Sequence, residues 1–270
     1  MSALATRLFR GREAVPALDP ADRGLAYGDG LFETMRVAAG RIPWWDAHLA
    51  RLARGATVLG FPAPDAGWLK AQAGQLLEAA PEQAVLKLVL TRGAGGRGYA
   101  PPAAPEPGLV LSLHALPPAV GPLRLRWCNT RLSLQPALAG IKHLNRLDQV
   151  LARAEWQDPD IHEGLMLDAR GHVGCATAAN LFAFIEGRWL TPSLADGGVT
   201  GLARAWVLAR EPAAAQATLT PADLASAEAL FLCNAVRGIL PVGQLGDIRW
   251  PTHPATESLR RDLGRELSAA

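Results

Sequence analysis

The chain has 270 residues, of which 49% are hydrophobic and 19% are charged, and its formal net charge is +2. A chain of this size buries one large core or two medium ones, and we expect two domains. The basic residues are scattered along the sequence. This distribution argues against binding to nucleic acid or to an anionic membrane and favours a small-molecule ligand.

The cysteines and histidines predict neither disulfides nor a metal site. Cys128, Cys175 and Cys233 are odd in number and lack C-x-x-C spacing, and the six histidines are dispersed. The first sixteen residues contain no apolar signal-peptide core, and no later apolar run approaches the roughly 20 residues that span a bilayer. We therefore expect a cytoplasmic protein without a bound metal.

The pattern of helices and strands expected in the first half of the chain predicts a smaller α/β domain over residues 1–116. Hydrophobic patterning predicts a helix after Pro43 with Asp46 as its N-cap and a second helix over residues 67–79. The predicted strands cover residues 31–37, 84–91 and 108–113. The prolines around residues 116–122 withhold backbone donors and restrict their neighbours, so we place a linker at residues 117–122.

The second half, residues 123–270, predicts the larger domain. After a strand over residues 123–127, one helical face carries Leu144, Leu147, Leu151 and Ala154, which places Lys142 at a loop-to-helix junction. A closing helix over residues 256–267 has Thr256 as its expected cap. The other predicted elements are antiparallel strands over residues 164–167, 180–185 and 188–190, a helix over residues 202–210 and a strand over residues 229–233.

Lys142 is one of only three lysines among 27 basic residues. An arginine stays protonated, whereas a desolvated lysine amine can lose its proton, attack a carbonyl and then act as a general base. A surface lysine without a function is the alternative at this position. The rarity of lysine makes Lys142 a candidate nucleophile.

Two glycine-rich segments are candidate anion sites. Residues 93–98 match G-x-G-x-x-G, but they run into Tyr99-Ala-Pro-Pro rather than into a helix, which argues against a dinucleotide-binding fold. A plain hairpin loop is the alternative to a mobile loop that brings Arg97 and Tyr99 to a ligand. Residues 197–204 precede a helix, whose first N–H groups and dipole favour a phosphate, although many ordinary helices begin in this way.

The motifs, taken in chain order, resemble a known enzyme family. The segments are Asp22-Arg-Gly-Leu-Ala-Tyr-Gly-Asp-Gly-Leu-Phe-Glu-Thr-Met-Arg36, His48-Leu-Ala-Arg-Leu52, the loop at residues 91–99, Lys142 to Asp148, Asn180-Leu-Phe182 and Gly198 to Arg204. Together they are similar to the class IV aminotransferases, the pyridoxal-phosphate enzymes of fold type IV. The resemblance implies an α/β (α+β) fold of two domains with the cofactor in the cleft between them, and a homodimer.

The resemblance also implies roles for individual residues. Lys142 would bind pyridoxal 5'-phosphate covalently and then transfer protons. The expected cofactor ligands are Arg51 for the phosphate, together with Leu202, Ala203, Asn234 and Ala235, whose loops would supply N–H groups, and Cys175 at the pyridine nitrogen. Arg97, Tyr99 and Arg237 are candidates for binding two substrate carboxylates, on their chemical type more than on any motif, and Thr34 and Tyr27 are further substrate candidates. For Arg237, a solvated arginine at a strand end is the alternative.

Within the family, three segments resemble the members that cleave 4-amino-4-deoxychorismate into 4-aminobenzoate, a folate precursor, and pyruvate. They are the loop at residues 91–99, the run Gly140-Ile-Lys-His-Leu-Asn-Arg-Leu147 and Cys233-Asn-Ala235. The resemblance therefore implies a lyase that acts by β-elimination. The alternatives are a branched-chain or D-amino-acid aminotransferase and a non-catalytic ligand-binding relative.

Cys175 departs from the family pattern, which has a glutamate five residues before the Asn of Asn-Leu-Phe. A thiol is a weak donor and cannot stabilise a protonated pyridine nitrogen as a carboxylate does, so the cofactor would be a poorer electron sink. This departure disfavours transamination. It suits an elimination that creates an aromatic ring, although an impaired enzyme or a carboxylate supplied from elsewhere would also fit.

Overall fold

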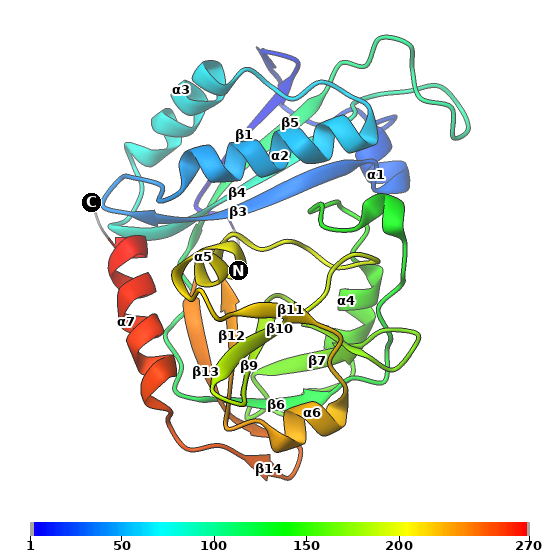
Figure 1. The fold of residues 1–270 in the computed structure, drawn as a ribbon. Coiled ribbons are helices and arrows are strands. Elements are labelled where there is room, and N and C mark those ends of the chain that lie inside the picture. The colour runs from blue at the N-terminus through cyan, green and yellow to red at the C-terminus, as the bar shows by residue number, and fades with distance from the viewer. Residues whose placement is uncertain (1–2, 269–270) are drawn as a thin grey trace. The chain divides into compact units, whose positions relative to one another are not determined.

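The computed structural model describes residues 3–268, which form two compact units (Figure 1). Unit 1 contains residues 3–117, Ile141–Asn145 and Ser268, and unit 2 contains Pro118–Gly140 and Arg146–Leu267. The first boundary lies at the start of the expected linker. The short segment around Lys142 belongs by its contacts to unit 1, although it lies far along the chain from the rest of that unit.

Unit 1 is built on a five-stranded antiparallel sheet with the order β2-β1-β5-β4-β3. The strands are β1 (Ala5–Arg10), β2 (Glu13–Ala14), β3 (Gly30–Ala38), β4 (Gln83–Thr91) and β5 (Gly108–Ala115). Strand register places Leu31, Leu90, Leu109 and Phe9 in one row across the sheet, and all four are buried. Since side chains alternate between faces, this row defines the apolar face.

Helices α2 (Trp45–Leu59) and α3 (Ala66–Leu77) cover this apolar face, while α1 (Arg23–Tyr27) precedes β3 (Figure 1). A Cβ on Gly55 of α2 would come within 2.7 Å of Leu31, so α2 lies close against β3. Trp68 of α3 makes an edge contact with Phe9 of β1, with ring centroids 5.1 Å apart. The two helices therefore bury opposite ends of the same sheet face.

Unit 2 is built on a nine-stranded mixed sheet with the order β11-β10-β9-β12-β13-β6-β7-β8, and β14 pairs with β13. Its strands are β6 (Leu123–Trp127), β7 (Glu163–Leu167), β8 (Val173–Ala176), β9 (Asn180–Ile185), β10 (Arg188–Pro192), β11 (Ala215–Ala217), β12 (Ala229–Asn234), β13 (Gly238–Leu245) and β14 (Ile248–Arg249). Leucines of β6, β7, β9, β12 and β13 form its main apolar core.

The helical elements of unit 2 are η1 (Pro136–Leu138), α4 (Leu147–Arg153), α5 (Leu202–Arg210), α6 (Pro221–Ser226) and α7 (Pro254–Ser268). Helix α5 packs on β12, α4 on β7 and α6 on β9. Thr220 caps α6 by bonding to Asp223. The predicted phosphate donors Leu202 and Ala203 lie in the first turn of α5.

Three predictions about helix ends were wrong. The N-cap of α2 is Trp44 with a left-handed φ of 60°, and Asp46 lies within the first turn. Helix α4 begins at Leu147, so Leu144 precedes it, and Leu147 and Leu151 are exposed rather than packed on a common buried face. Thr256 is a buried residue inside α7. The carbonyls of Trp44 and His253 already accept the first intrahelical bonds, from the N–H groups of His48 and Glu257, so α2 and α7 begin before the polar residues that were predicted as caps.

Two further observations concern disulfides and membrane-spanning helices. Cys128, Cys175 and Cys233 form no disulfide, and all three are buried. Within residues 3–268, no helix is both long enough and apolar enough to cross a membrane.

Candidate active site

Lys142 is fixed against the edge strand of unit 1. Its carbonyl accepts a hydrogen bond from the Phe32 N–H at 2.9 Å, and the Leu144 N–H donates to the Gly30 carbonyl at 2.9 Å. Residues 141–145 therefore extend the sheet beside β3, with Leu31 opposite His143. The Lys142 Nζ lies 4.0 Å from the centroid of the Phe32 ring. The backbone of the candidate nucleophile is thus held by a strand more than 100 residues earlier in the sequence.

Arg51 lies in a buried network that the sequence analysis did not identify. Its Nε and Nη2 donate to the two carboxylate oxygens of Glu33 at 2.8 and 2.5 Å, and His48 Nδ1 lies 2.7 Å from Glu33 Oε2. Glu33 is fully buried on β3, while His48 and Arg51 are buried on α2. A glutamate between the apolar residues Leu31 and Met35 at alternating positions was the sequence signal for such a buried carboxylate.

The charges in this network follow from its contacts. Burial raises the pKa of Glu33, but hydrogen bonds from Arg51 and His48 outweigh it, so the pKa is held below its ordinary value. Burial lowers the pKa of His48, the charges of Arg51 and Lys142 lower it further, and the bond to Glu33 opposes them only partly. His48 is therefore neutral at pH 7 and donates from Nδ1, so the network consists of one carboxylate and one guanidinium.

A second, partly buried carboxylate, Asp29, holds the base of the glycine-rich loop. Arg23 Nε and Arg92 Nε donate to Asp29 Oδ2 at 2.9 and 2.7 Å. The Arg23 guanidinium also donates to the carbonyls of Gly98, Tyr99 and Ala100 at 2.8 to 3.2 Å. The sequence analysis gave Asp29 and Arg23 no individual role. The structure shows that they position the loop that carries Arg97 and Tyr99.

The predicted substrate residues of unit 1 lie in two places. Tyr27, at the end of α1, has its ring centroid 5.4 Å from that of Tyr99, whose side chain is 84% exposed. Arg97 lies in the same loop and is exposed. Thr34 is half-buried on β3, on the same face as Phe32 and therefore on the face towards which the Lys142 amine points.

In unit 2, the N-terminus of α5 presents the predicted phosphate donors. Leu202 and Ala203 occupy its first turn, and the N-cap Gly201 contributes no side-chain hydrogen bond. A Cβ on Gly201 would come within 2.1 Å of Asn180 Oδ1, so only glycine fits there. The Asn180 amide in turn donates to the Val199 carbonyl at 3.0 Å. The family's Asn-Leu-Phe motif therefore fixes the loop that leads into α5.

The loop after β12 is shaped by Asn234. Its Oδ1 accepts hydrogen bonds from the N–H groups of Val236 and Arg237 at 3.1 and 2.8 Å, and its Nδ2 donates to the Ala178 carbonyl at 3.2 Å. This turn positions the backbone of Ala235. Asn234 therefore acts by shaping the loop, and its side chain is already occupied by backbone partners.

Arg237, predicted to bind a substrate carboxylate, is half-buried and has an acidic neighbour in Glu163. The Glu163 carboxylate accepts hydrogen bonds from the Thr177 hydroxyl and from the Gly164 N–H. Burial raises the pKa of Glu163, and the charge of Arg237 opposes that shift. An acidic neighbour reduces the net positive potential that Arg237 offers to an anion.

Cys175 lies in a small apolar cluster with Cys128, Met166 and Trp156. Glu163 lies on the opposite face of β7, because side chains alternate along a strand and Met166 points into the Cys175 cluster. Arg146 is close enough to Cys175 for their charges to interact, although burial dominates and lowers the pKa of the guanidinium. One charged group near Cys175 is therefore the Arg146 cation.

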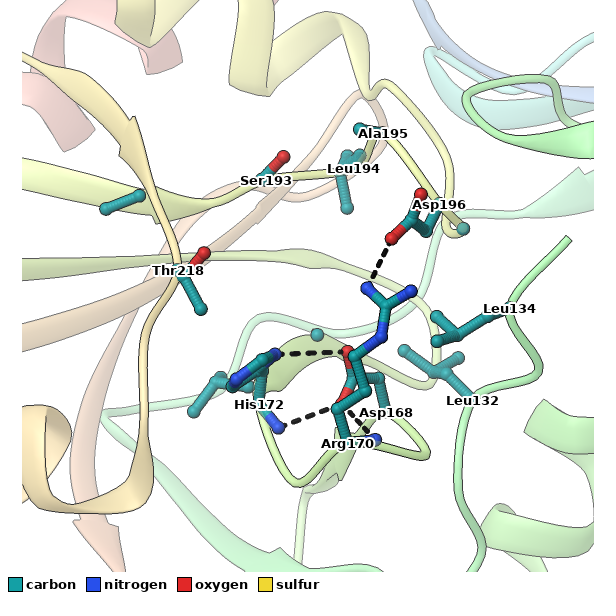
Figure 2. Close-up of a pocket in the computed structure, with 14 residues that line it drawn as sticks. Leu132, Leu134, Asp168, Arg170, His172, Ser193, Leu194, Ala195, Asp196 and Thr218 are labelled. Carbon is teal, nitrogen blue, oxygen red and sulfur yellow. Dashed lines mark hydrogen bonds and ion pairs between the residues drawn. The ribbon is translucent and has the colours of Figure 1, made fainter. Parts of the chain in front are cut away.

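A pocket of about 100 Å³ lies beside Gly197, at the start of the loop before α5. Figure 2 shows Arg170 extending to Asp196, with Nη1 and Oδ2 2.5 Å apart, and His172 near Asp168. The side chains at its apolar end include Leu132, Leu134 and Leu194. Its charged groups are paired with one another, so we treat the pocket as a support of the glycine loop rather than as a ligand site.

The chain belongs to the class IV aminotransferase family, because the family model described as "Amino-transferase class IV" matches residues 30–245. This confirms the resemblance and the fold class predicted from the motifs. The chain is 35% identical to a Vibrio harveyi protein named aminodeoxychorismate lyase, covering 90% of this chain and 94% of that protein.

Two further comparisons define how this chain relates to known proteins. The crystal structure of 4-amino-4-deoxychorismate lyase from Pseudomonas aeruginosa superposes with a TM-score of 0.90 at 41% identity, covering 97% of this chain and 99% of that one. A putative branched-chain-amino-acid aminotransferase from Methanocaldococcus jannaschii is 29% identical, covering 83% of this chain and 81% of that protein. Similarity to lyases therefore exceeds similarity to this aminotransferase in both identity and coverage.

Proposed function

We propose that this protein is a pyridoxal-phosphate-dependent aminodeoxychorismate lyase. The observation that carries the proposal is the similarity to two lyases over nearly the whole chain, one of them at 41% identity. The chemistry of the site agrees with it, since a lysine is held in a fixed position beside β3. The reaction cleaves 4-amino-4-deoxychorismate into 4-aminobenzoate and pyruvate.

The donor groups of the chain fit pyridoxal phosphate. In unit 2, the uncapped first turn of α5 at Leu202 and Ala203 and the Asn234-shaped turn at Ala235 offer backbone N–H groups, which suit a phosphate. In unit 1, the buried guanidinium of Arg51 is suited to a bidentate contact with phosphate oxygens. We propose these residues as phosphate ligands and Lys142 as the covalent attachment point.

Lys142 is the proposed proton carrier. The cofactor, when bound, supplies an electron sink next to the substrate nitrogen. The Lys142 amine takes the proton from the ring carbon that bears this nitrogen, and that C–H electron pair becomes a ring double bond. The C–O bond to the neighbouring carbon breaks, and its electron pair leaves with enolpyruvate, which gains a proton to become pyruvate. The ring is then the aromatic ring of 4-aminobenzoate.

Cys175 fits a lyase better than it fits a transaminase. A buried thiol with the Arg146 cation nearby does not stabilise a protonated pyridine nitrogen. Transamination depends on a strong electron sink, whereas aromatisation itself favours the elimination. The residue at position 175 therefore lowers the expected rate of amino transfer more than the expected rate of elimination.

The substrate has two carboxylates, and we propose Arg97 and Arg237 as their partners, with Tyr99, Thr34 and Tyr27 as further contacts. Asp29 and Arg23 support the Arg97 loop at its base, which limits the entropy that the loop loses when substrate binds. Glu163 makes Arg237 the weaker of the two anion sites.

We also propose a homodimer. Leu147, Val150 and Leu151 of α4 are 58 to 74% exposed and lie three and four residues apart, so they form an apolar stripe on the helix surface. A second copy of the chain would bury this stripe. Val150→Glu should therefore shift the mass measured by light scattering towards that of a monomer, whereas Val58→Glu, at a similarly exposed valine of α2, should not.

The proposed activity is tested by feeding aminodeoxychorismate to the cofactor-loaded protein and following pyruvate and 4-aminobenzoate, alongside amino transfer to 2-oxoglutarate. Equal amounts of the two products are expected from aminodeoxychorismate. Rapid amino transfer from leucine or D-alanine, with no pyruvate from aminodeoxychorismate, would establish an aminotransferase instead. Cofactor binding without either reaction would indicate a non-catalytic relative.

A further inference from the structure

Glu33 makes two hydrogen bonds with Arg51, the side chain that is proposed to bind phosphate. Its two carboxylate oxygens receive Arg51 Nε and Nη2 at 2.8 and 2.5 Å. This side-on pairing fixes the plane of the guanidinium and directs its other edge, formed by Nη1 and Nη2, away from Glu33. The pairing therefore sets the direction in which that second edge points.

His48 holds Glu33 in turn. Its Nδ1 lies 2.7 Å from the Glu33 oxygen that also receives Arg51 Nη2. His48 and Arg51 are three residues apart on α2, so one helix face supplies both donors, and Glu33 comes from β3. The exposed fractions of the side chains are 1% for Glu33 and His48 and 5% for Arg51. Water therefore does not compete for these bonds.

We propose that Glu33, locked by His48, is a positioning residue that holds the Arg51 guanidinium in the orientation needed to bind the phosphate of the cofactor. This inference rests on the proposed function, because it assumes that Arg51 is a phosphate ligand. The contact network carries the inference. A carboxylate that served only to neutralise Arg51 would need neither a side-on pairing nor a third partner.

Two effects of removing the Glu33 charge oppose each other. Without the carboxylate, Arg51 has a larger net positive charge to attract phosphate. However, the amide of a glutamine at this position would direct an N–H group at one of the two Arg51 donors, whichever way it turned. One of the two Arg51 N–H groups that face position 33 then lacks an acceptor, and the buried guanidinium moves out of its orientation. We expect the loss of orientation to be the larger effect, because the site is dry and no solvent contact restores the geometry.

The experiment measures the affinity of the apoprotein for pyridoxal phosphate and for pyridoxal, which lacks the phosphate, from the change in visible absorbance. For Glu33→Gln we expect pyridoxal phosphate to bind about tenfold more weakly, a change of about 1.4 kcal/mol. The affinity for pyridoxal should change by less than about twofold. Glu82→Gln, an exposed glutamate of the same unit, is the matched control and should change neither.

A double variant separates positioning from a general structural role. If Glu33 acts through Arg51, adding Glu33→Gln to Arg51→Ala should cause no further loss of pyridoxal phosphate affinity. Additive losses, equal losses for pyridoxal and its phosphate, an unchanged affinity or tighter binding in Glu33→Gln would each overturn the proposal. If Glu33→Gln does not fold, Glu33→Asp, which withdraws the carboxylate by one methylene group, takes its place with the same expected and overturning results.

The same measurements test the underlying assumption separately. Arg51→Ala should weaken pyridoxal phosphate binding by about ten- to a hundredfold, since a charge-assisted hydrogen bond to phosphate is worth about 1.5 to 3 kcal/mol. If Arg51→Ala binds pyridoxal phosphate as the unchanged protein does, the ligand assignment of Arg51 is wrong and the inference falls with it. If Arg51→Ala weakens binding and Glu33→Gln does not, only the positioning role of Glu33 is wrong.

Discussion

Lys142 and Phe32 contact each other twice, once through the backbone and once through their side chains. The Phe32 N–H donates to the Lys142 carbonyl at 2.9 Å, and the Lys142 Nζ lies 4.0 Å from the Phe32 ring centroid. An ammonium over an aromatic face is attracted to it, so the ring and the strand together limit the directions that the amine can take. Lys87 lies over the same ring at the longer distance of 6.0 Å and therefore provides a matched comparison.

The first prediction concerns this pair of lysines. Lys142→Ala should abolish both the borohydride-stable link between protein and cofactor and the release of pyruvate, because no amine remains at that position. Lys87→Ala should retain both. Peptide mapping by mass spectrometry identifies the labelled residue. A label on Lys87 or Lys70 would show that Lys142 is not the attachment point.

The second prediction concerns substrate binding by Arg97. Arg97 is exposed in a loop whose base is held by Arg23. Arg97→Ala should raise KM for aminodeoxychorismate by about tenfold, or about 1.4 kcal/mol, and leave the visible spectrum of the bound cofactor intact. Arg54→Ala, at an exposed arginine of α2, is the control and should leave KM unchanged. An altered cofactor spectrum in Arg97→Ala would place Arg97 at the cofactor rather than at the substrate.

The third prediction concerns Cys175. Cys175→Glu places a carboxylate where the family has one, and the nearby Arg146 cation favours its ionised form. The variant should gain slow conversion of its cofactor to the pyridoxamine form with simple amino acids. Elimination should change by less than about tenfold, or about 1.4 kcal/mol, because aromatisation favours it.

The control for this variant is Cys175→Ser, which removes the thiol without adding a charge. It should gain no amino transfer, and absorbance spectra report the pyridoxamine form in both variants. If Cys175→Glu gains no amino transfer in a folded, cofactor-loaded protein, the absence of a carboxylate at position 175 is not what limits transamination.

The fourth prediction concerns the pH dependence of stability at Asp29. Burial raises the pKa of Asp29, but hydrogen bonds from Arg92 and Arg23 outweigh it, and the net pKa lies below the ordinary value of 3.8. The stability that these pairs contribute is therefore present above pH 3.8 and is lost as the pH falls through the lower folded-state pKa.

Asp29→Asn tests this dependence. It should destabilise the protein at pH 7 by about 3 kcal/mol, since two buried guanidinium groups lose their counter-charge. Urea unfolding at pH 7, 5 and 3 should show the difference from the unchanged protein persisting at pH 5 and shrinking below pH 3.8. Asp247→Asn, at an exposed turn, should have little effect at any pH. A difference that stayed constant down to pH 3 would contradict the assignment of the Asp29 charge.

The sequence by itself determined the family and the central strands and helices, because the motifs and the hydrophobic runs that indicate them lie in short segments. Residues 31–37 were predicted as a strand and the β-branched and leucine-rich runs 84–91 and 108–113 as buried strands, and the structure has β3, β4 and β5 there. Helix α5 has the predicted bounds, Leu202–Arg210. Short or weakly patterned elements such as β2, β11 and α6 were not predicted, since a few residues carry little periodic signal.

Only the tertiary structure decided which residues meet. Pairing of residues 141–145 with β3 joins segments more than 100 residues apart, and no local pattern encodes that register. The Glu33–His48–Arg51 network likewise requires α2 to lie on the apolar face of the sheet. A buried charge is stable only when all of its hydrogen-bonding and charged partners surround it. Only the fold brings these partners together, so the sequence alone does not show which residues form the network.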